Sequence, residues 1–236
     1  MPWLSPGNLL GASGGFRAAY LKLVPGFERA SGHKVMSAWG GSMGSAPTTI
    51  PNRLQRGEVY DVVIMAGDGL DDLIRQHKIV AGSRVDLARS MIGVAVRAGA
   101  AKPDISSAEA VKRALTQAQS VAFSSSASGV YLIGLFERMG IGEIMKAKSK
   151  QILGEPVAAV VARGEAEICF QQISEILPVQ GIDYVGPLPN EIQEITIFAA
   201  GIAANAQQAQ AARELMQYLS APANAAAIKK SGMEPM

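Results

Sequence analysis

The sequence predicts an α/β protein built on mostly parallel sheets. Short apolar segments alternate along the chain with amphipathic segments of helical periodicity, and repeated strand–loop–helix units are typical of this class. The segment Asp61–Met65 is almost unbroken in its apolar character, as in a parallel strand that is buried on both faces. The chain has 236 residues, of which 48% are hydrophobic, so it can form two small cores.

In the first half, the strand Asn8–Ala12 ends at Ser13-Gly14-Gly15 and precedes a helix from Phe16 to about Ala30. Pro25 falls inside this helix and predicts a distortion there. The remaining elements follow from apolar runs and from Gly, Ser or Asp at their ends: strand Lys34–Trp39, a polar helix reaching Gly57, strand Asp61–Met65, helix Asp68–Gln76 and strand Ser90–Val96.

In the second half, the capping-box pattern Ser106–Glu109 opens a helix. Pro156 stands at the favoured first position of another helix. The same apolar patterns predict strands Ser120–Phe123, Ala166–Phe170, Ile182–Val185 and Glu194–Ala199, and helices Val130–Met139, Gln207–Leu219 and Pro222–Lys230.

Composition excludes several functions. Lys and Arg number 22 against 20 Asp and Glu, without a basic block, so we expect no nucleic-acid partner. The single cysteine, Cys169, and two distant histidines predict no metal site and no disulfide, and the cysteine is expected to be a buried, inert thiol. No nucleotide-binding glycine motif is present, and we expect no cofactor. No apolar run approaches the ~20 residues of a membrane span, and no secretory signal is visible.

Three loops combine small residues with a following helix: Ser13-Gly14-Gly15, Gly41-Ser42-Met43 and Ser124-Ser125-Ser126. Backbone N–H groups and the positive end of the dipole make a helix start an anion site, and such loops meet at the carboxyl edge of a parallel sheet. Serine adds a neutral hydroxyl donor. Ordinary caps and turns have the same composition, so both interpretations remain open.

The segment Gly40–Gly44 also matches the G-x-S-x-G pattern of a hydrolase nucleophile. That chemistry requires an acid and a histidine downstream, and the only histidine there, His77, ends an amphipathic helix. The pattern therefore does not predict a hydrolase.

The chain resembles the molybdate-binding periplasmic protein family, the solute-binding components of ABC transporters with the type II fold. The resemblance lies in the order of many short stretches: Ser13-Gly14-Gly15, Gly32–Val35, Trp39–Ser42, Arg56–Glu58, Asp61–Ile64, Ile92–Val96, Val160–Phe170 and Gly232–Pro235.

The resemblance implies two α/β lobes, each a mostly parallel sheet flanked by helices, joined by two crossing strands. Lobe one would be residues 1–88 plus 194–236 and lobe two residues 89–193, with the ligand in a cleft between them. It also implies a periplasmic monomer without membrane insertion, which binds a small anion and delivers it to an ABC transporter membrane component. Because the family is exported, we expect the sequence to be a mature form or to have a misassigned start.

The family holds a tetrahedral dianion with neutral donors. By resemblance, Ser13 and Ser42 match its two serines, Ser125 lies in the loop that supplies a backbone amide, and Phe170 replaces its tyrosine. Arg89 is either a surface arginine at the hinge or a ligand contact whose guanidinium pairs both oxygens of a carboxylate, and both interpretations stay open. These departures favour an organic carboxylate, or another oxyanion, over molybdate. The full set of predicted ligand-binding residues is Ser13, Gly14, Gly15, Ser42, Met43, Arg89, Ser124, Ser125, Ser126 and Phe170.

An enzyme is the alternative, because aconitate isomerase resembles this family. Isomerisation of a tricarboxylate requires a base for one C–H and donors that stabilise the enolate-like charge. The serine loops would supply the donors, and Glu165, Glu167 and Glu175 are candidates for the base, whereas His33 is remote in the sequence. Binding protein and isomerase both stay open, and the sequence assigns no catalytic residue.

Overall fold

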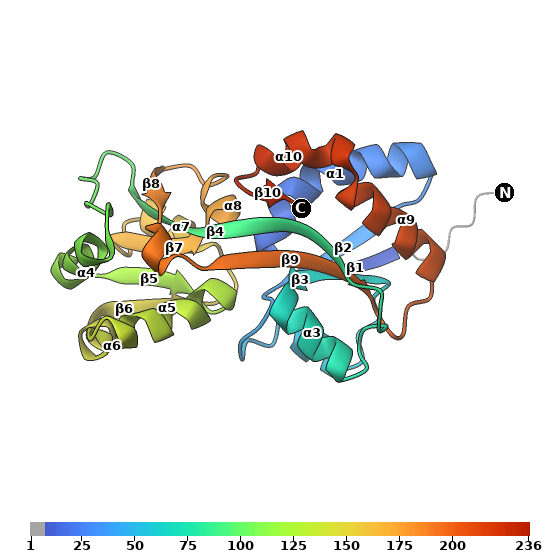
Figure 1. Ribbon diagram of the computed structural model, residues 1–236, viewed down its shortest axis with the longest axis horizontal. Coiled ribbons are helices and arrows are strands. Elements are labelled where there is room, and N and C mark those ends of the chain that lie inside the picture. The colour runs from blue at the N-terminus through green and yellow to red at the C-terminus, as the bar shows by residue number, and fades with distance from the viewer. Residues whose placement is uncertain (1–7) are drawn as a thin grey trace. The chain divides into compact units, whose positions relative to one another are not determined.

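The computed structural model describes residues 8–236 and divides into two compact units (Figure 1). Unit 1 holds the described residues up to Arg89 together with Ile197–Met236, and unit 2 is Ser90–Thr196. The chain passes between the units within two long strands, β4 (Val85–Arg97) and β9 (Ile195–Ile202). No helix in the described residues is both long and apolar enough to cross a membrane.

Unit 1 is built on a mixed sheet with the strand order β2-β1-β3-β9-β4. The strands β1 (Asn8–Ser13), β2 (Val35–Gly40) and β3 (Val62–Ala66) run parallel, and β9 runs antiparallel to β3. The short β10 (Glu234–Pro235) pairs antiparallel with β4. The helices of this unit are α1 (Gly14–Ser31), α2 (Ile50–Gln55), α3 (Gly67–Arg75), α9 (Ala209–Ser220) and α10 (Ala225–Lys229), with a 3-10 turn at Pro222–Asn224.

Successive side chains of β3 point to opposite faces of this sheet, and each face has its own hydrophobic core. Val62 and Ile64 pack with residues of α1, α9 and α10, whereas Val63 and Met65 pack with residues of α2 and α3. Each strand side chain therefore removes apolar area from water on its own face, at ~25 cal/mol per Å². This two-sided burial explains why the β3 sequence lacks a polar face.

Unit 2 has the strand order β4-β7-β5-β6, and β8 also pairs with β4. The strands β5 (Val121–Ser124), β6 (Ser149–Ile152) and β7 (Ile168–Gln172) run parallel, while β4 is antiparallel to both β7 and β8 (Ile182–Pro187). The helices are α4 (Ala108–Gln117), α5 (Ala127–Arg138), α6 (Gly142–Lys148), α7 (Val157–Ala162) and α8 (Ile173–Ile176), with a 3-10 turn at Asn190–Ile192.

The faces of this second sheet also bury different partners. Phe170 and Val94 pack with α4, α5 and α6 on one face, and Cys169 and Ala95 pack with α7 and α8 on the other. Cys169 is buried, and burial raises the pKa of its thiol to about 12, which confirms the predicted inert core cysteine.

The predicted fold class is confirmed, and several element boundaries are corrected. Helix α1 begins at Gly14 rather than Phe16 and continues through Pro25, and α5 begins at Ala127 rather than Val130. The helix Gly142–Lys148 and the strand Ser149–Ile152 were not predicted. A four-residue edge strand with three consecutive polar residues gives no periodic signal.

Candidate functional site

In unit 1, the carboxyl ends of the three parallel strands lie at one edge of the sheet. Ser13 at the end of β1 is opposite Gly40 at the end of β2, and Ala12 is opposite Ile64 of β3. Ser42 lies two residues after the end of β2. The fold therefore brings Ser13, Gly14, Ser42 and Met43 to the same edge, as expected for a ligand-binding edge in an α/β sheet.

Ser13 is the N-cap residue of α1, and its side chain makes no capping hydrogen bond. It is followed by Gly14, which begins an 18-residue helix whose first N–H groups have no intrahelical acceptor. Gly15 has a packing role, because a Cβ atom there would collide with the ring of Phe198 on β9. The small residues thus allow the close packing of α1 on the sheet at the position where the helix begins.

Ser42 is buried, and it connects the loop after β2 to the end of β3. Its Oγ accepts a hydrogen bond from the backbone N of Ala66, the last residue of β3, at 2.9 Å. The Met43 side chain approaches the start of α3, where its Cε would contact a Cβ placed on Gly69. Ser42 therefore has a structural function in addition to any contact with a ligand.

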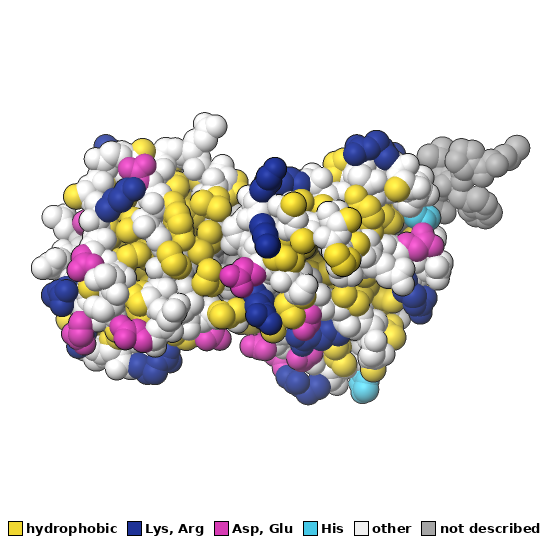
Figure 2. Space-filling view, turned by 45° about the horizontal axis from the view of Figure 1, so that its top comes forward, with side chains coloured by type: hydrophobic (Ala, Val, Ile, Leu, Met, Phe, Trp, Pro, Cys, Tyr) yellow, Lys and Arg dark blue, Asp and Glu magenta, His cyan; other side chains and the backbone are white. Residues whose placement is uncertain are grey.

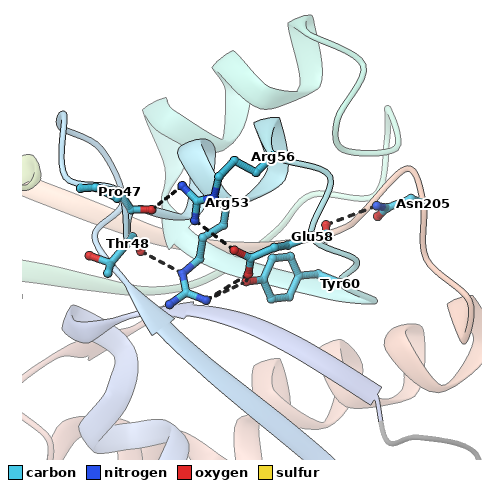
Figure 3. A network of polar contacts seen from close by, with 7 residues as sticks. All are labelled: Pro47, Thr48, Arg53, Arg56, Glu58, Tyr60 and Asn205. Atoms are coloured by element: carbon cyan, nitrogen blue, oxygen red, sulfur yellow. Dashed lines mark hydrogen bonds and ion pairs between the residues drawn. The ribbon is translucent and has the colours of Figure 1, made fainter.

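A polar network fixes the rest of the loop between β2 and α2 (Figure 3). Arg53 donates to the carbonyl of Thr48 at 3.2 Å, and Arg56 donates to the carbonyl of Pro47 at 2.8 Å. Both guanidinium groups also donate to the carboxylate of Glu58, at 3.0 Å each. The hydroxyl of Tyr60 donates to the same carboxylate and, with the two arginines, lowers the pKa of Glu58.

Arg89 lies on β4, opposite Glu234 of β10. Its side chain is exposed, and within the part of the chain that the structure describes it makes no ion pair. The exposed guanidinium is available to an external carboxylate. Arg89 is the last residue of unit 1 on β4, and its contact with a ligand stays a prediction.

In unit 2, the parallel strands again end at one edge. Ser124 at the end of β5 is opposite Ile152 at the end of β6, and Phe123 is opposite Phe170 of β7. The Ser124 Oγ lies 2.9 Å from the Ser128 Oγ and accepts from the backbone N of Ser126 at 3.3 Å. The backbone N of Ser125 donates to the carbonyl of Ile152 at 3.2 Å, so that amide is already used within the protein.

Gly129 allows α5 to approach β5 closely, since a Cβ there would collide with the carbonyl oxygen of Ser124. As a result, the amides of Ala127 and Ser128 begin the helix directly beside the serine loop. The first N–H groups of an α-helix point outward without an intrahelical acceptor. The start of α5 therefore presents donors and a positive dipole end at this edge.

Phe170 has a different environment from the one expected. It is buried in the core beside Phe123 and two residues before the end of β7. Its ring packs in the hydrophobic core of unit 2. The last two residues of β7 are Gln171 and Gln172. Sequence analysis missed both glutamines, although two amide side chains directly after an apolar strand were a visible signal.

The two glutamines point to opposite faces of the sheet. Gln171 accepts a hydrogen bond from the backbone N of Ala158 in α7 at 3.3 Å. Gln172 donates through Nε2 to the Thr196 hydroxyl at 2.9 Å, while its Oε1 has no partner. Ser90 of β4 likewise has a buried hydroxyl without a partner.

Of the three candidate bases, only Glu175 lies at the carboxyl edge of unit 2. Glu165 is exposed and paired with Arg163 at 2.6 Å, which lowers its pKa. Glu167 precedes β7, at the opposite edge, and accepts from the backbone N of Gln119 at 2.8 Å. Glu175 follows β7 in the first turn of α8, hydrogen-bonds Gln171, and burial raises its pKa to about 7.

Among the residues that the structure describes, His33 and the surface charges give no sign of a metal site or of a basic face. His33 hydrogen-bonds Glu214 at 3.3 Å, beyond the end of α1 that is remote from Ser13. No group of three His, Cys, Asp or Glu suited to a metal ion occurs in residues 8–236. On the face drawn in Figure 2, Lys and Arg side chains form small separate groups interspersed with acidic and neutral ones.

Residues 9–234 match the model of one protein family, described as bacterial extracellular solute-binding proteins. The match spans almost the whole chain. The chain belongs to this family. The main functional expectation from the sequence, a solute-binding protein, is therefore confirmed at this level.

Relatives of this solute-binding protein differ in what they are named for. Over 95% of the chain it is 47% identical to a protein from Pseudomonas sp. called aconitate isomerase, of which it covers 86%. Among solved structures, it resembles the periplasmic molybdate-binding protein of Azotobacter vinelandii, with a TM-score of 0.78 and 20% identity over 96% of this chain and 98% of that one. A sulfate-binding protein from Mycobacterium tuberculosis gives a TM-score of 0.74 at 14% identity, over 98% and 88% of the two chains.

Proposed function

We propose that this solute-binding protein binds a small organic polycarboxylate of the aconitate class. The observation that carries the proposal is the 47% identity to an aconitate isomerase along 95% of the chain. This relative shares nearly half of its residues with the chain, whereas the molybdate- and sulfate-binding structures share only the fold at 20% identity or less. The carboxylate preference expected from the sequence agrees with this assignment.

Neutral donors suit such a ligand. Ser13 with the start of α1, and Ser125 with the start of α5, each combine a hydroxyl with backbone N–H groups. Hydrogen bonds to a charged group contribute about 1.5–3 kcal/mol each, so a few of them hold a carboxylate without a full counter-charge. Arg89 would add a bidentate partner, as the planar guanidinium matches a carboxylate.

Family membership also supports a transport role. We propose that the ligand is taken up through an ABC transporter membrane component, that the protein acts as a monomer in the periplasm, and that the two units close on the ligand. The passage of the chain between units through only β4 and β9 supports a hinged closure.

Isomerisation of the ligand is a second candidate function, favoured by Glu175. A carboxylate with a pKa near neutrality is suited to proton transfer. It would remove a proton from the methylene carbon of aconitate, the electron pair would delocalise into the adjacent double bond and carboxylate, and a proton returned to the allyl system would complete the geometric isomerisation. The donors at the strand ends would stabilise the transient charge.

Two experiments test these functions separately. A thermal-shift panel of molybdate, tungstate, sulfate, phosphate, citrate and trans-aconitate identifies the ligand, because a ligand that binds only the folded state raises its stability. We expect the largest shift with a polycarboxylate. Incubation with trans-aconitate, followed by proton NMR, tests catalysis: the cis isomer appears if the protein is an isomerase, and a bound but unchanged ligand rejects that candidate.

A further inference from the structure

Two buried polar atoms without partners lie close together in unit 2. The Ser90 Oγ and the Gln172 Oε1 make no hydrogen bond in the structure, and their residues are only 1% and 3% exposed. A buried polar group that lacks a partner is expensive. Such groups are rare in folded proteins and require an explanation. One explanation is contact with a ligand.

Strand register places both groups on the same face. Gln172 of β7 is opposite Ile92 of β4, and Ser90 precedes Ile92 by two residues, so its side chain points to the same side. Diagonal neighbours in an antiparallel pair have Cα atoms about 7–8 Å apart, near enough for one small ligand to contact both. The two orphan groups therefore belong to a single locus.

This locus adjoins the start of α5. Phe170 shares its face with Gln172 and packs against Leu132 and Phe136 of α5. Phe170 is opposite Phe123, and Gln172 is the last residue of β7, so it lies at the sheet edge where the loop Ser124–Ser126 leads into α5. Gln172 is thus a nine-tenths-buried side chain with an unpaired atom, on the sheet face that α5 covers.

We propose that Gln172 and Ser90 form a ligand subsite in which the Gln172 amide and the Ser90 hydroxyl donate to one carboxylate of the ligand. Thr196 orients the amide. Its hydroxyl accepts from Gln172 Nε2 in the structure, but a hydroxyl also donates, so a half-turn of the amide keeps this bond and turns the NH2 group toward the ligand. The subsite rests on the proposed polycarboxylate function and would distinguish a large ligand from a compact oxyanion.

The test is the variant Gln172→Met, measured by calorimetry with trans-aconitate and by melting without ligand. Loss of donation to a charged group should weaken binding roughly tenfold to a hundredfold. The ligand-free protein should melt at nearly the same temperature, because removal of an unsatisfied buried polar atom offsets the hydrogen bond lost to Thr196. Gln171→Met is the matched control for stability: this neighbouring glutamine is equally buried and its amide is hydrogen-bonded, so its replacement should lower the melting temperature.

Ser90→Ala repeats the test with a smaller change, in case Gln172→Met folds poorly, and should also weaken binding without lowering the melting temperature. Affinity equal to wild type in both variants would overturn the subsite. So would undiminished binding by Gln172→Glu, which cannot donate when ionised. If the wild-type protein itself fails to bind trans-aconitate, the proposed function is rejected, and that result is distinct from failure of the subsite.

Discussion

The side-chain amide of Gln171 hydrogen-bonds the carboxyl group of Glu175, four residues further along the chain. The Oε1 of Gln171 is already used as acceptor for the backbone N of Ala158, so its Nε2 is the atom that donates to Glu175. This arrangement orients the carboxyl group at the strand edge. Burial acts more strongly than this bond and raises the pKa of Glu175 to about 7.

The first prediction concerns catalysis by Glu175. If the protein isomerises aconitate, Glu175→Gln should reduce the rate by a factor of about 10² or more, the usual contribution of a general base, while trans-aconitate still binds. In the wild type, the rate should rise with pH through about 7, as Glu175 ionises. Glu167→Gln is the matched control and should leave the rate unchanged, since this carboxylate lies at the opposite edge. An unchanged rate in Glu175→Gln would exclude Glu175 as the base.

The second prediction concerns stability and needs no ligand. The pKa of Glu175 is above its ordinary value of 4.5 in the folded state, so folding favours the protonated form. This contribution is fully present below about pH 4.5 and is lost as the pH rises through about 7. Melting temperatures of wild type and Glu175→Gln should therefore diverge from pH 5 to pH 8, with the variant gaining relative stability. A difference that is constant with pH would mean that Glu175 titrates normally.

The third prediction separates ligand contacts from structural serines. The Ser13 side chain makes no capping hydrogen bond, and within residues 8–236 the Ser125 side chain has no hydrogen bond. Each change to Ala should therefore weaken binding of trans-aconitate roughly tenfold to a hundredfold with little change in melting temperature. Ser42→Ala should lower both the affinity for trans-aconitate and the melting temperature, because the buried amide of Ala66 loses its acceptor, at a cost of about 1–3 kcal/mol. Early melting with normal affinity in Ser13→Ala and Ser125→Ala would show that these loops are turns.

The fourth prediction is compaction on ligand binding. Two units connected through β4 and β9 should favour a closed form when a ligand contacts both. Small-angle scattering should show a smaller radius of gyration at saturating trans-aconitate than without it. An identical scattering curve at saturation would argue against closure.

Local sequence patterns predicted much of this molecule. Small residues after apolar strands placed Ser13 and Ser124 correctly at strand ends, because helix starts and strand ends leave strong local signals. Sequence could not show that Phe170 packs in the core, or that Gln172 keeps an unpaired atom, since both depend on the register between β5, β7 and β4. The choice among Glu165, Glu167 and Glu175 likewise required the fold, which places them at different edges or beside Arg163.

The ligand class is the central claim, and titration calorimetry with trans-aconitate and with molybdate tests it most directly on the wild-type protein. The identity to an aconitate isomerase and the neutral donors at both strand edges predict saturable binding of trans-aconitate, with molybdate binding much more weakly or not at all. Submicromolar binding of molybdate without measurable binding of trans-aconitate would contradict the account.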